Sequence, residues 1–246
     1  MSIRTAEELE KLKVIGKIVR RALDEMASAV RSGITTAELD ETGLRVLKEN
    51  GAEAAPAKVY GFPGSVCISV NDEAVHGVPG GRTLQEGDLV KLDLVAVKDG
   101  FYADAAVTVR VGQVSETADA LVRCAEDAFW KAMSVARVGF RTCHIGREVE
   151  REVTRRGFNV MPDLGGHGVG RTIHEHPSVP NFYDRSSRTK LSEGLVIAVE
   201  PIITAGTGRG VLSSDGWTIR TADRRLSAHY EHTIVITRGD PLLLTA

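Results

Sequence analysis

Apolar residues recur at helical intervals in four stretches of the chain. In the first, they repeat every three or four positions from Leu9 to Met26, and Thr5 and Glu8 have the spacing of a capping box. The pattern predicts helices at residues 5–30, 35–51, about 116–136 and about 142–156. No low-complexity linker separates them.

The remaining segments alternate between apolar and polar residues and contain short turns, which is typical of β-strands. Residues 59–111 have turn signals at Pro63-Gly64, Pro79-Gly80-Gly81 and Asp99-Gly100, and the last third of the chain is β-rich with glycine turns. The sequence therefore predicts a protein of mixed α and β structure, in which pairs of helices alternate with groups of strands.

The order helix–helix–strands occurs twice, and short segments repeat with it. RSGITTAEL at 31–39 aligns with RVGFRTCHI at 137–145, and LQEGDLVKLD at 84–93 aligns with LSEGLVIAVE at 191–200. The two offsets, 106 and 107 residues, are nearly equal, which favours an ancient duplication over chance. We predict two similar halves, about 1–112 and 113–246, packed into one domain of residues 1–246, with Asp93 and Glu200 in equivalent places.

The stretch KLDLVAVKDGFYADAAV (residues 91–107) places acids among apolar residues. Asp-Gly favours a two-residue type I′ turn, which would pair Val95 with Asp104. Asp93 would then lie diagonally from Asp104 on one face, with Cα atoms about 7–8 Å apart. Two inward carboxylates repel each other unless they are protonated or bridged by a cation, and a hard divalent cation would serve. The alternative is an edge strand whose acids are both solvated.

Two further acids, Glu200 in LVIAVE and Glu231 in SAHYEHTIVIT, also lie in β-rich apolar segments. Single acids in strands often face solvent, but four of them favour a shared site. GGHGVGRTIHEHPSVP supplies His167, His174 and His176, and no HExxH, dinucleotide or Walker motif is present. Carboxylates with imidazoles suit Mn²⁺, Fe²⁺ or Co²⁺, with Zn²⁺ possible, and two ions would balance the charge and activate a water.

Composition narrows the class of protein. The net charge of −2 gives no reason to expect a nucleic-acid partner, and no apolar run approaches the roughly 20 residues that span a bilayer. The three cysteines, Cys67, Cys124 and Cys143, lack CxxC spacing, so we expect reduced thiols in a cytoplasmic protein. We expect the isolated histidines His144 and His232 to be structural.

Together these segments resemble a type I methionine aminopeptidase of the bacterial form. The resemblance covers nearly the whole chain and is carried by GFPGSVCISVNDEAVHGVP, KLDLVAVKDGFYADAAVTV, GGHGVGRTIHEHPSVPNF, VIAVEPII and DGWTIRTADRRLSAHYEHTIVIT. It implies the pita-bread fold, an α/β (α+β) domain in which two helix–helix–strand halves are related by a pseudo-twofold axis around a central antiparallel sheet.

The resemblance also implies five metal ligands. Asp93 would chelate one of two divalent ions through both oxygens. Asp104 and Glu231 would bridge the two ions, and His167 and Glu200 would complete the shell of the second.

Catalytic and substrate-binding roles follow from the same resemblance. Glu200 would handle the proton of the metal-bridging water, and His174 would donate a hydrogen bond to the scissile carbonyl oxygen. His76 would contact the scissile amide nitrogen or the leaving amine. The pocket for a methionine side chain, whose thioether suits aromatic edges, would be lined by Phe62, Cys67, His76 and Trp217, with His174 at the scissile bond.

Some positions depart from the family pattern, and one pair resembles a further ion site. The departures are Val59, Tyr60, Ile173, His176 and His229, the last of which stands where glutamine is usual. None of them removes a ligand, but they bear on substrate preference and rate. Asn71 and Ser227 resemble residues that hold a structural monovalent cation in some members.

We therefore predict a monomeric cytoplasmic hydrolase that removes the initiator methionine from nascent chains whose second residue is small. Its partners would be polypeptide N-termini, with transient ribosome contact, and neither nucleic acid nor membrane. One alternative is another pita-bread peptidase, of the prolidase or aminopeptidase P kind, which carries an extra N-terminal domain. Others are a non-enzymatic binding module on this fold, which would generally lose ligands, or a metal-storing protein.

Overall fold

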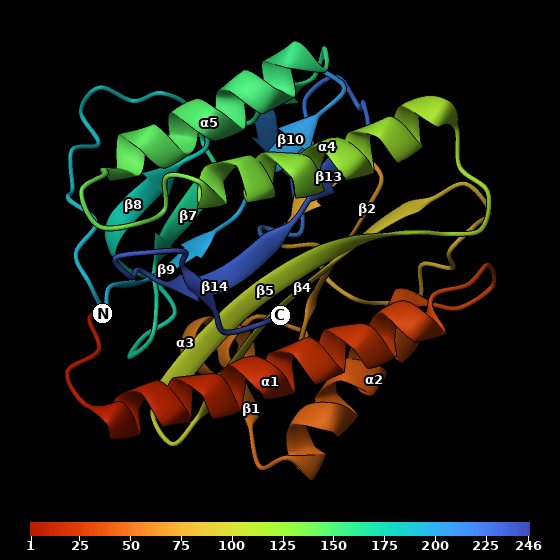
Figure 1. Ribbon diagram of the computed structural model, residues 1–246. Coiled ribbons are helices and arrows are strands. Elements are labelled where there is room, and N and C mark those ends of the chain that lie inside the picture. The colour runs from red at the N-terminus through yellow and green to blue at the C-terminus, as the bar shows by residue number, and fades with distance from the viewer.

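The computed structural model describes residues 1–246 and contains five helices and fifteen strands (Figure 1). The helices are α1 (Ala6–Ala29), α2 (Thr36–Glu49), α3 (Ala55–Tyr60), α4 (Glu116–Met133) and α5 (Thr142–Arg155). The strands are β1 (Glu53–Ala54), β2 (Cys67–Val70), β3 (Glu73–Val75), β4 (Leu89–Lys98), β5 (Phe101–Arg110), β6 (Asn159–Val160), β7 (Gly165–Gly168), β8 (Glu175–Pro180), β9 (Val196–Val199), β10 (Ile202–Thr204), β11 (Gly210–Leu212), β12 (Ile219–Thr221), β13 (Ser227–His229), β14 (Glu231–Val235) and β15 (Leu242–Leu243).

The four long helices begin where the sequence predicts. The Thr5 hydroxyl accepts a hydrogen bond from the Glu8 N–H (3.2 Å), and the capping box of Thr35 and Glu38 is complete at the start of α2. The short helix α3 was not predicted, because six residues are too few to show a period. Its early Pro56 is a common feature of a first helical turn, where the proline's missing N–H costs nothing.

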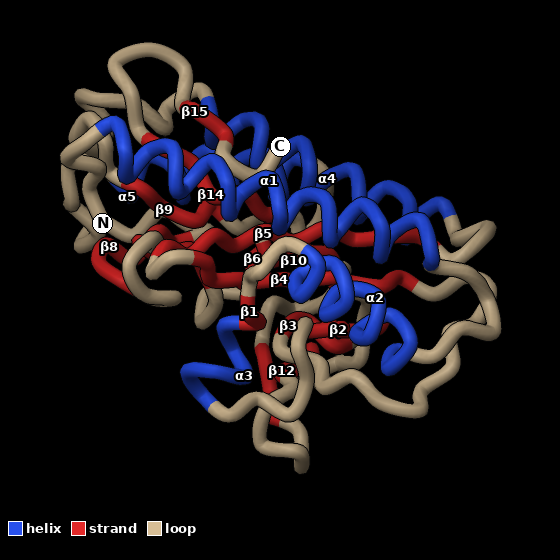
Figure 2. Tube along the Cα trace, turned by 90° about the horizontal axis from the view of Figure 1, so that it is seen from below, coloured by secondary structure: helices blue, strands red, loops and turns tan.

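A nine-stranded antiparallel sheet forms the centre, in the order β1-β4-β5-β14-β9-β7-β8, with β2 paired to β4 and β15 to β14. Figure 2 shows α1, α4 and α5 along one side of this sheet and α3 on the other. Two three-stranded sheets, β13-β10-β6 and β11-β12-β3, complete the fold. No helix is both long and apolar enough to cross a bilayer.

Strand alternation gives β4 two different faces. Val90, Leu92 and Leu94 pack into the hydrophobic core beneath α1 and α2. Lys91 and Asp93 therefore share the opposite face, away from those helices. The sheet itself thus separates the main core from a polar side.

The predicted hairpin is confirmed. Asp99 and Gly100 have φ values of 51° and 78°, as a type I′ turn requires, and they join β4 directly to β5. Val95 faces Asp104, and Asp93 faces Ala106. The two aspartates are diagonal neighbours on one face.

The two halves repeat in detail. α2 and α5 each have 14 residues and begin at Thr36 and Thr142. The residue before each helix makes an isolated antiparallel bridge, Thr35 with Thr83 and Arg141 with Lys190. In Figure 1 the pair α1–α2 and the pair α4–α5 lie toward opposite edges of the central sheet. The predicted fold class, with its duplicated halves and antiparallel sheet, is confirmed.

Candidate metal centre and active site

A cavity of about 230 Å³ opens on the polar side of the sheet. All ten residues that the sequence singles out for the site line it: Phe62, Cys67, His76, Asp93, Asp104, His167, His174, Glu200, Trp217 and Glu231. Sequence reasoning missed other lining residues, which come from α3, from strands of all three sheets and from the loop before β7: Pro56, Val75, Val95, Asp163, Leu164, Gly165 and Ile202.

Four carboxylates, which we call the acid cluster (Asp93, Asp104, Glu200 and Glu231), converge at this cavity. They come from β4, β5, the residue after β9, and β14, and His167 comes from β7. These five strands are consecutive neighbours in the sheet, so each strand contributes one candidate ligand. Residues spread over 138 positions of sequence are therefore brought together by strand order alone.

The candidate ligands form two groups that share Glu231. The ligand atoms of Asp104, His167 and Glu231 lie within 4.8 Å of one another, and so do those of Glu200, His229 and Glu231. His167 Nε2 lies 3.6 Å from Asp104 Oδ2 and 3.4 Å from Glu200 Oε1. Asp93 lines the cavity beside them but belongs to neither group.

Burial shifts the pKa values of these groups strongly. It raises the pKa of Asp93 to about 7 and, together with the charge of Asp93, raises the pKa of Glu200 to about 8. Burial and the neighbouring carboxylates hold the pKa values of Asp104 and Glu231 well above their usual range. Burial and the nearby His174 lower the pKa of His167 to about 4. Four acids here cannot all be ionised at neutral pH without a compensating positive charge.

Several buried polar atoms at this centre lack any hydrogen-bond partner. They are Asp104 Oδ1, Glu231 Oε1, and both ring nitrogens of His229. More than nine-tenths of buried polar groups in proteins are bonded, so such a concentration in one place requires a cause. Divalent cations would satisfy the two carboxylate oxygens and one nitrogen of His229 and would neutralise the carboxylates, so the residues present fit the metal site that the resemblance implies.

The other side of the cavity is apolar. The Phe62 and Trp217 rings meet edge to face with centroids 5.3 Å apart. Cys67 is buried beside Asp93 on the neighbouring strand, and burial raises the pKa of its thiol well above the usual value. A thiol that stays protonated is a poor nucleophile, so Cys67 contributes wall surface rather than chemistry.

His174 and His76 flank the acid cluster. The Tyr60 hydroxyl lies 2.7 Å from His174 Nδ1, and the His174 ring lies 4.3 Å from the His167 ring. His76 has a φ of 57°, a left-handed conformation that is uncommon outside glycine. The Gly77 N–H donates to Ser69 Oγ (2.9 Å), a contact that holds the segment after His76. Burial lowers the pKa of both His76 and His174, which favours their neutral forms.

The remaining histidines behave differently. His144 Nδ1 accepts the Arg141 N–H at the start of α5. The His232 ring bonds the hydroxyls of Thr245 and Tyr230. Both have the structural roles that the sequence suggested. Val59 and His176 are exposed and do not line the cavity.

The expected monovalent-cation position holds a lysine nitrogen. Lys91 is 1% exposed, and its Nζ donates to the carbonyl oxygens of Asn71 (2.7 Å) and Ser227 (3.4 Å). The Ser227 hydroxyl also donates to Asn71 O (2.9 Å). Burial, opposed by the charge of Glu73, lowers the pKa of Lys91 to about 7. The oxygens expected to bind an ion are thus already bonded within the chain.

Known proteins resemble this chain over its full length. The methionine aminopeptidase 2 of Bacillus subtilis is 44% identical over 247 residues, covering 100% of this chain and 99% of the relative. The crystal structure of a methionine aminopeptidase from Thermotoga maritima superimposes with a TM-score of 0.96 at 38% identity, covering 100% and 99% of the two chains. The resemblance to methionine aminopeptidases found in the sequence is confirmed.

A more distant structure shares the fold alone. The prolidase from Pyrococcus furiosus superimposes with a TM-score of 0.81 at 24% identity, and the match covers 99% of this chain but 65% of the prolidase.

The model of the metallopeptidase family M24 matches residues 10–238, which include every candidate ligand described above. The chain therefore belongs to metallopeptidase family M24.

Proposed function

We propose that the chain is a metallo-aminopeptidase that releases the N-terminal methionine of polypeptides whose second residue is small. One observation carries the proposal: a single cavity joins the acid cluster to an apolar wall, and all ten expected residues line it. A substrate must place a charged α-amino group and an apolar side chain within a few ångströms of each other. The cavity has an acidic end and an apolar end to receive them.

The metal ions would be two divalent cations, Co²⁺, Mn²⁺ or Fe²⁺, with Zn²⁺ as a further possibility, held by Asp93, Asp104, His167, Glu200 and Glu231. When bound, they would anchor the substrate amine and make a nucleophile of water. Glu200 accepts the proton of the attacking water at a side-chain oxygen. Burial and the charge of Asp93 raise the proton affinity of this carboxylate, so that in its ionised form it can take up that proton.

His174 would stabilise the oxyanion that forms at the scissile carbonyl. We propose that the Tyr60 hydroxyl donates to His174 Nδ1, which leaves the ring hydrogen on Nε2. That N–H can then point at the developing negative charge. Tyr60, one of the departures from the family pattern, would act as a positioning residue for His174.

His76 would contact the scissile nitrogen, and the apolar wall would receive the methionine side chain. Phe62 and Trp217 present edges and faces that suit a thioether, and Cys67 adds a small apolar surface. A large second residue would meet the cavity mouth near Tyr60 and His174. We propose that this contact restricts the second residue to small side chains.

We further propose that the whole chain, residues 1–246, acts as one catalytic domain and works as a monomer in the cytoplasm. Its substrates would be nascent polypeptide N-termini, with transient contact to the ribosome. The full-length match to methionine aminopeptidases supports this over a prolidase-like role, since the prolidase similarity extends to the fold alone.

Peptide hydrolysis tests the proposal directly. Metal-loaded protein is incubated with Met-Gly-Met-Met and with a matched Met-Leu peptide. We expect release of one methionine from the first and little from the second. If no methionine is released with any of Co²⁺, Mn²⁺ or Fe²⁺, the proposed enzymatic activity is refuted. Release of a first residue only before proline would instead favour an aminopeptidase P activity.

A further inference from the structure

His229 lies at the back of the metal centre, where its backbone fixes its position. It ends β13 and faces Ile202 of β10. Its N–H donates to Thr108 Oγ1 (2.9 Å), and that hydroxyl donates back to His229 O (2.8 Å). The side chain is 1% exposed. The backbone at His229 is therefore fixed, and the side chain is shielded from water.

Neither ring nitrogen of His229 has a hydrogen-bond partner. The contrast with His232, three residues further along, is direct. His232 is equally buried, but its two nitrogens bond the hydroxyls of Thr245 (2.9 Å) and Tyr230 (3.1 Å). An imidazole without partners in a dry interior carries a desolvation cost that a structural histidine avoids.

Both distances from His229 to a carboxylate exceed a hydrogen bond, and the shorter one is that of two neighbouring ligands. Its Nε2 lies 3.4 Å from Glu231 Oε2 and 3.8 Å from Glu200 Oε2. Hydrogen bonds between nitrogen and oxygen are about 2.7–3.2 Å long. Two donors on one ion, each with a bond of about 2.0–2.2 Å, are about 3.0–3.5 Å apart. His167 Nε2 has nearly the same separations, 3.4 Å and 3.6 Å, from its two carboxylates.

We propose that His229 is a sixth metal ligand, beside Glu200 and Glu231, so that the centre has two imidazoles. The ligand atoms of His229, Glu200 and Glu231 lie within 4.8 Å of one another, as do those of His167, Asp104 and Glu231. The proposal rests on the metal site of the proposed function, but not on its substrate. A second imidazole in place of the usual glutamine makes the donor set softer, which favours Co²⁺, Fe²⁺ or Zn²⁺ over Mn²⁺.

Cobalt binding to the full chain tests this inference without any peptide. Metal-free protein is titrated with Co²⁺ by calorimetry, and the two-cobalt form is examined by visible and X-ray absorption. We expect the wild type to show on average one imidazole per cobalt, and His229→Gln to show half of one. We also expect His229→Gln to weaken one of the two binding events by at least about tenfold.

His144→Gln is the matched control, because it removes one imidazole far from the cavity. Glutamine is a normal residue at this capping position, so helix α5 should persist. Its cobalt affinity and imidazole count should equal those of the wild type. An unchanged affinity and spectrum in His229→Gln would overturn the proposal.

A measurement on the wild type covers the case in which His229→Gln fails to fold. The two-cobalt protein should show two hyperfine-shifted imidazole N–H resonances in its proton NMR spectrum, and a single resonance would overturn the assignment. If two imidazoles bind cobalt but the protein releases no methionine, His229 is still a ligand and only the proposed function is refuted.

Discussion

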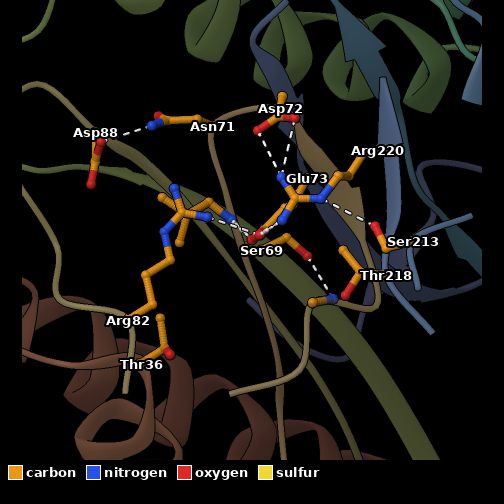
Figure 3. A network of polar contacts seen from close by, with 12 residues as sticks. Thr36, Ser69, Asn71, Asp72, Glu73, Arg82, Asp88, Ser213, Thr218 and Arg220 are labelled. Carbon is orange, nitrogen blue, oxygen red and sulfur yellow. Dashed lines mark hydrogen bonds and ion pairs between the residues drawn. The ribbon is translucent and has the colours of Figure 1, made fainter. Parts of the chain in front are cut away.

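Two charged clusters near β4, one partly exposed and one buried, differ in how their charges are compensated. We call the first the Glu73 network (Asp72, Glu73, Arg82 and Arg220); the charge of Glu73 acts on Lys91 of β4. The second is the acid cluster, to which Asp93 of β4 belongs. Figure 3 shows the Glu73 network, in which carboxylates and guanidinium groups meet directly.

Every carboxylate of the Glu73 network has partners within the chain. Glu73 Oε1 accepts from Arg82 (2.8 Å) and Arg220 (2.6 Å), and its Oε2 accepts the Val70 N–H (2.7 Å). Asp72 accepts from Arg220 at both oxygens (3.2 Å each). Burial acts to raise the pKa of Asp72, but the arginine hydrogen bonds outweigh it and hold that pKa below its usual value.

The acid cluster has four carboxylates and no lysine or arginine among them. Its pKa values move upward, and two of its oxygens have no partner. Pairing within the chain offsets the desolvation cost of a buried charge, whereas a buried charge left unpaired is costly until a ligand arrives. The comparison therefore separates a cluster whose charges are compensated within the chain from one that needs a ligand.

The largest expected effect is on activity. Asp104→Asn removes a ligand while leaving the shape, so methionine release should fall by about 10³-fold or more. The metal-free variant should be no less stable than the wild type, because a carboxyl that resists ionisation becomes a neutral amide. Steady-state kinetics and thermal unfolding measure both. Asp24→Asn, in an exposed pair on α1, is the control, and retained activity in Asp104→Asn would contradict the account.

The opposite pattern is expected in the Glu73 network. Glu73→Gln leaves two arginines without their shared acid, which should lower the free energy of unfolding by about 2 kcal/mol. The expected loss is below that of a fully buried pair, because the Arg82 side chain is 39% exposed. Urea unfolding measures it. Glu49→Gln, in an exposed pair, should change stability by less than about 0.5 kcal/mol. An equal loss in both variants would remove the distinction between the clusters.

Stability of the metal-free protein should fall as pH rises. The pKa values of Asp93 and Glu200 are about 7 and 8 in the fold, above the ordinary unfolded values of about 4. These two groups hold protons in the folded chain that they lack in the unfolded chain, so the stability they contribute, present in full below about pH 4, is lost as pH rises through 7 and 8. Below pH 7 the buried histidines oppose this trend, because the pKa values of His167 and His232 are lowered to about 4 and both rings stay neutral in the fold. We therefore expect a net loss of about 1–2 kcal/mol between pH 7 and 9 after screening by water. Thermal unfolding over that range tests this, and metal-loaded protein should lack the trend.

The smallest effect concerns a residue at the cavity mouth. Tyr60→Phe removes the hydroxyl beside His174 Nδ1, so kcat should fall about tenfold, less than the loss of an acid–base group itself. KM should change less than twofold, because the ring remains. An unchanged kcat would show that His174 needs no positioning by Tyr60.

Much of the fold and the positions of the acids followed from local rules, whereas the roles of the other site residues came from the family resemblance. The Asp99-Gly100 turn fixed the register that sets Asp93 diagonally from Asp104, and period-two alternation put both on one face. The duplication at an offset of about 106 residues then linked Asp93 to Glu200 in the other half. These signals are local or repeated along the chain, so they can be recognised in a single sequence.

Other features depend on partners that the sequence places far away. Glu73 meets Arg220 across 147 positions, and Lys91 meets Ser227 across 136. No local pattern specifies such contacts, because they arise from the packing of β3 against β12 and of β4 against β13. The position of His229 could have been predicted from the sequence. It lies two residues from Glu231 in an alternating segment, which assigns both side chains to the same face.

The most direct measurement is metal content paired with activity. Metal-free protein is titrated with Co²⁺ or Fe²⁺ under anaerobic conditions, and bound metal and methionine release from Met-Gly-Met-Met are followed together. The account predicts that activity is absent without metal, rises with the metal bound to the acid cluster, and saturates by two ions per chain. Full activity in metal-free protein, or metal that binds equally well to Asp104→Asn, would contradict it.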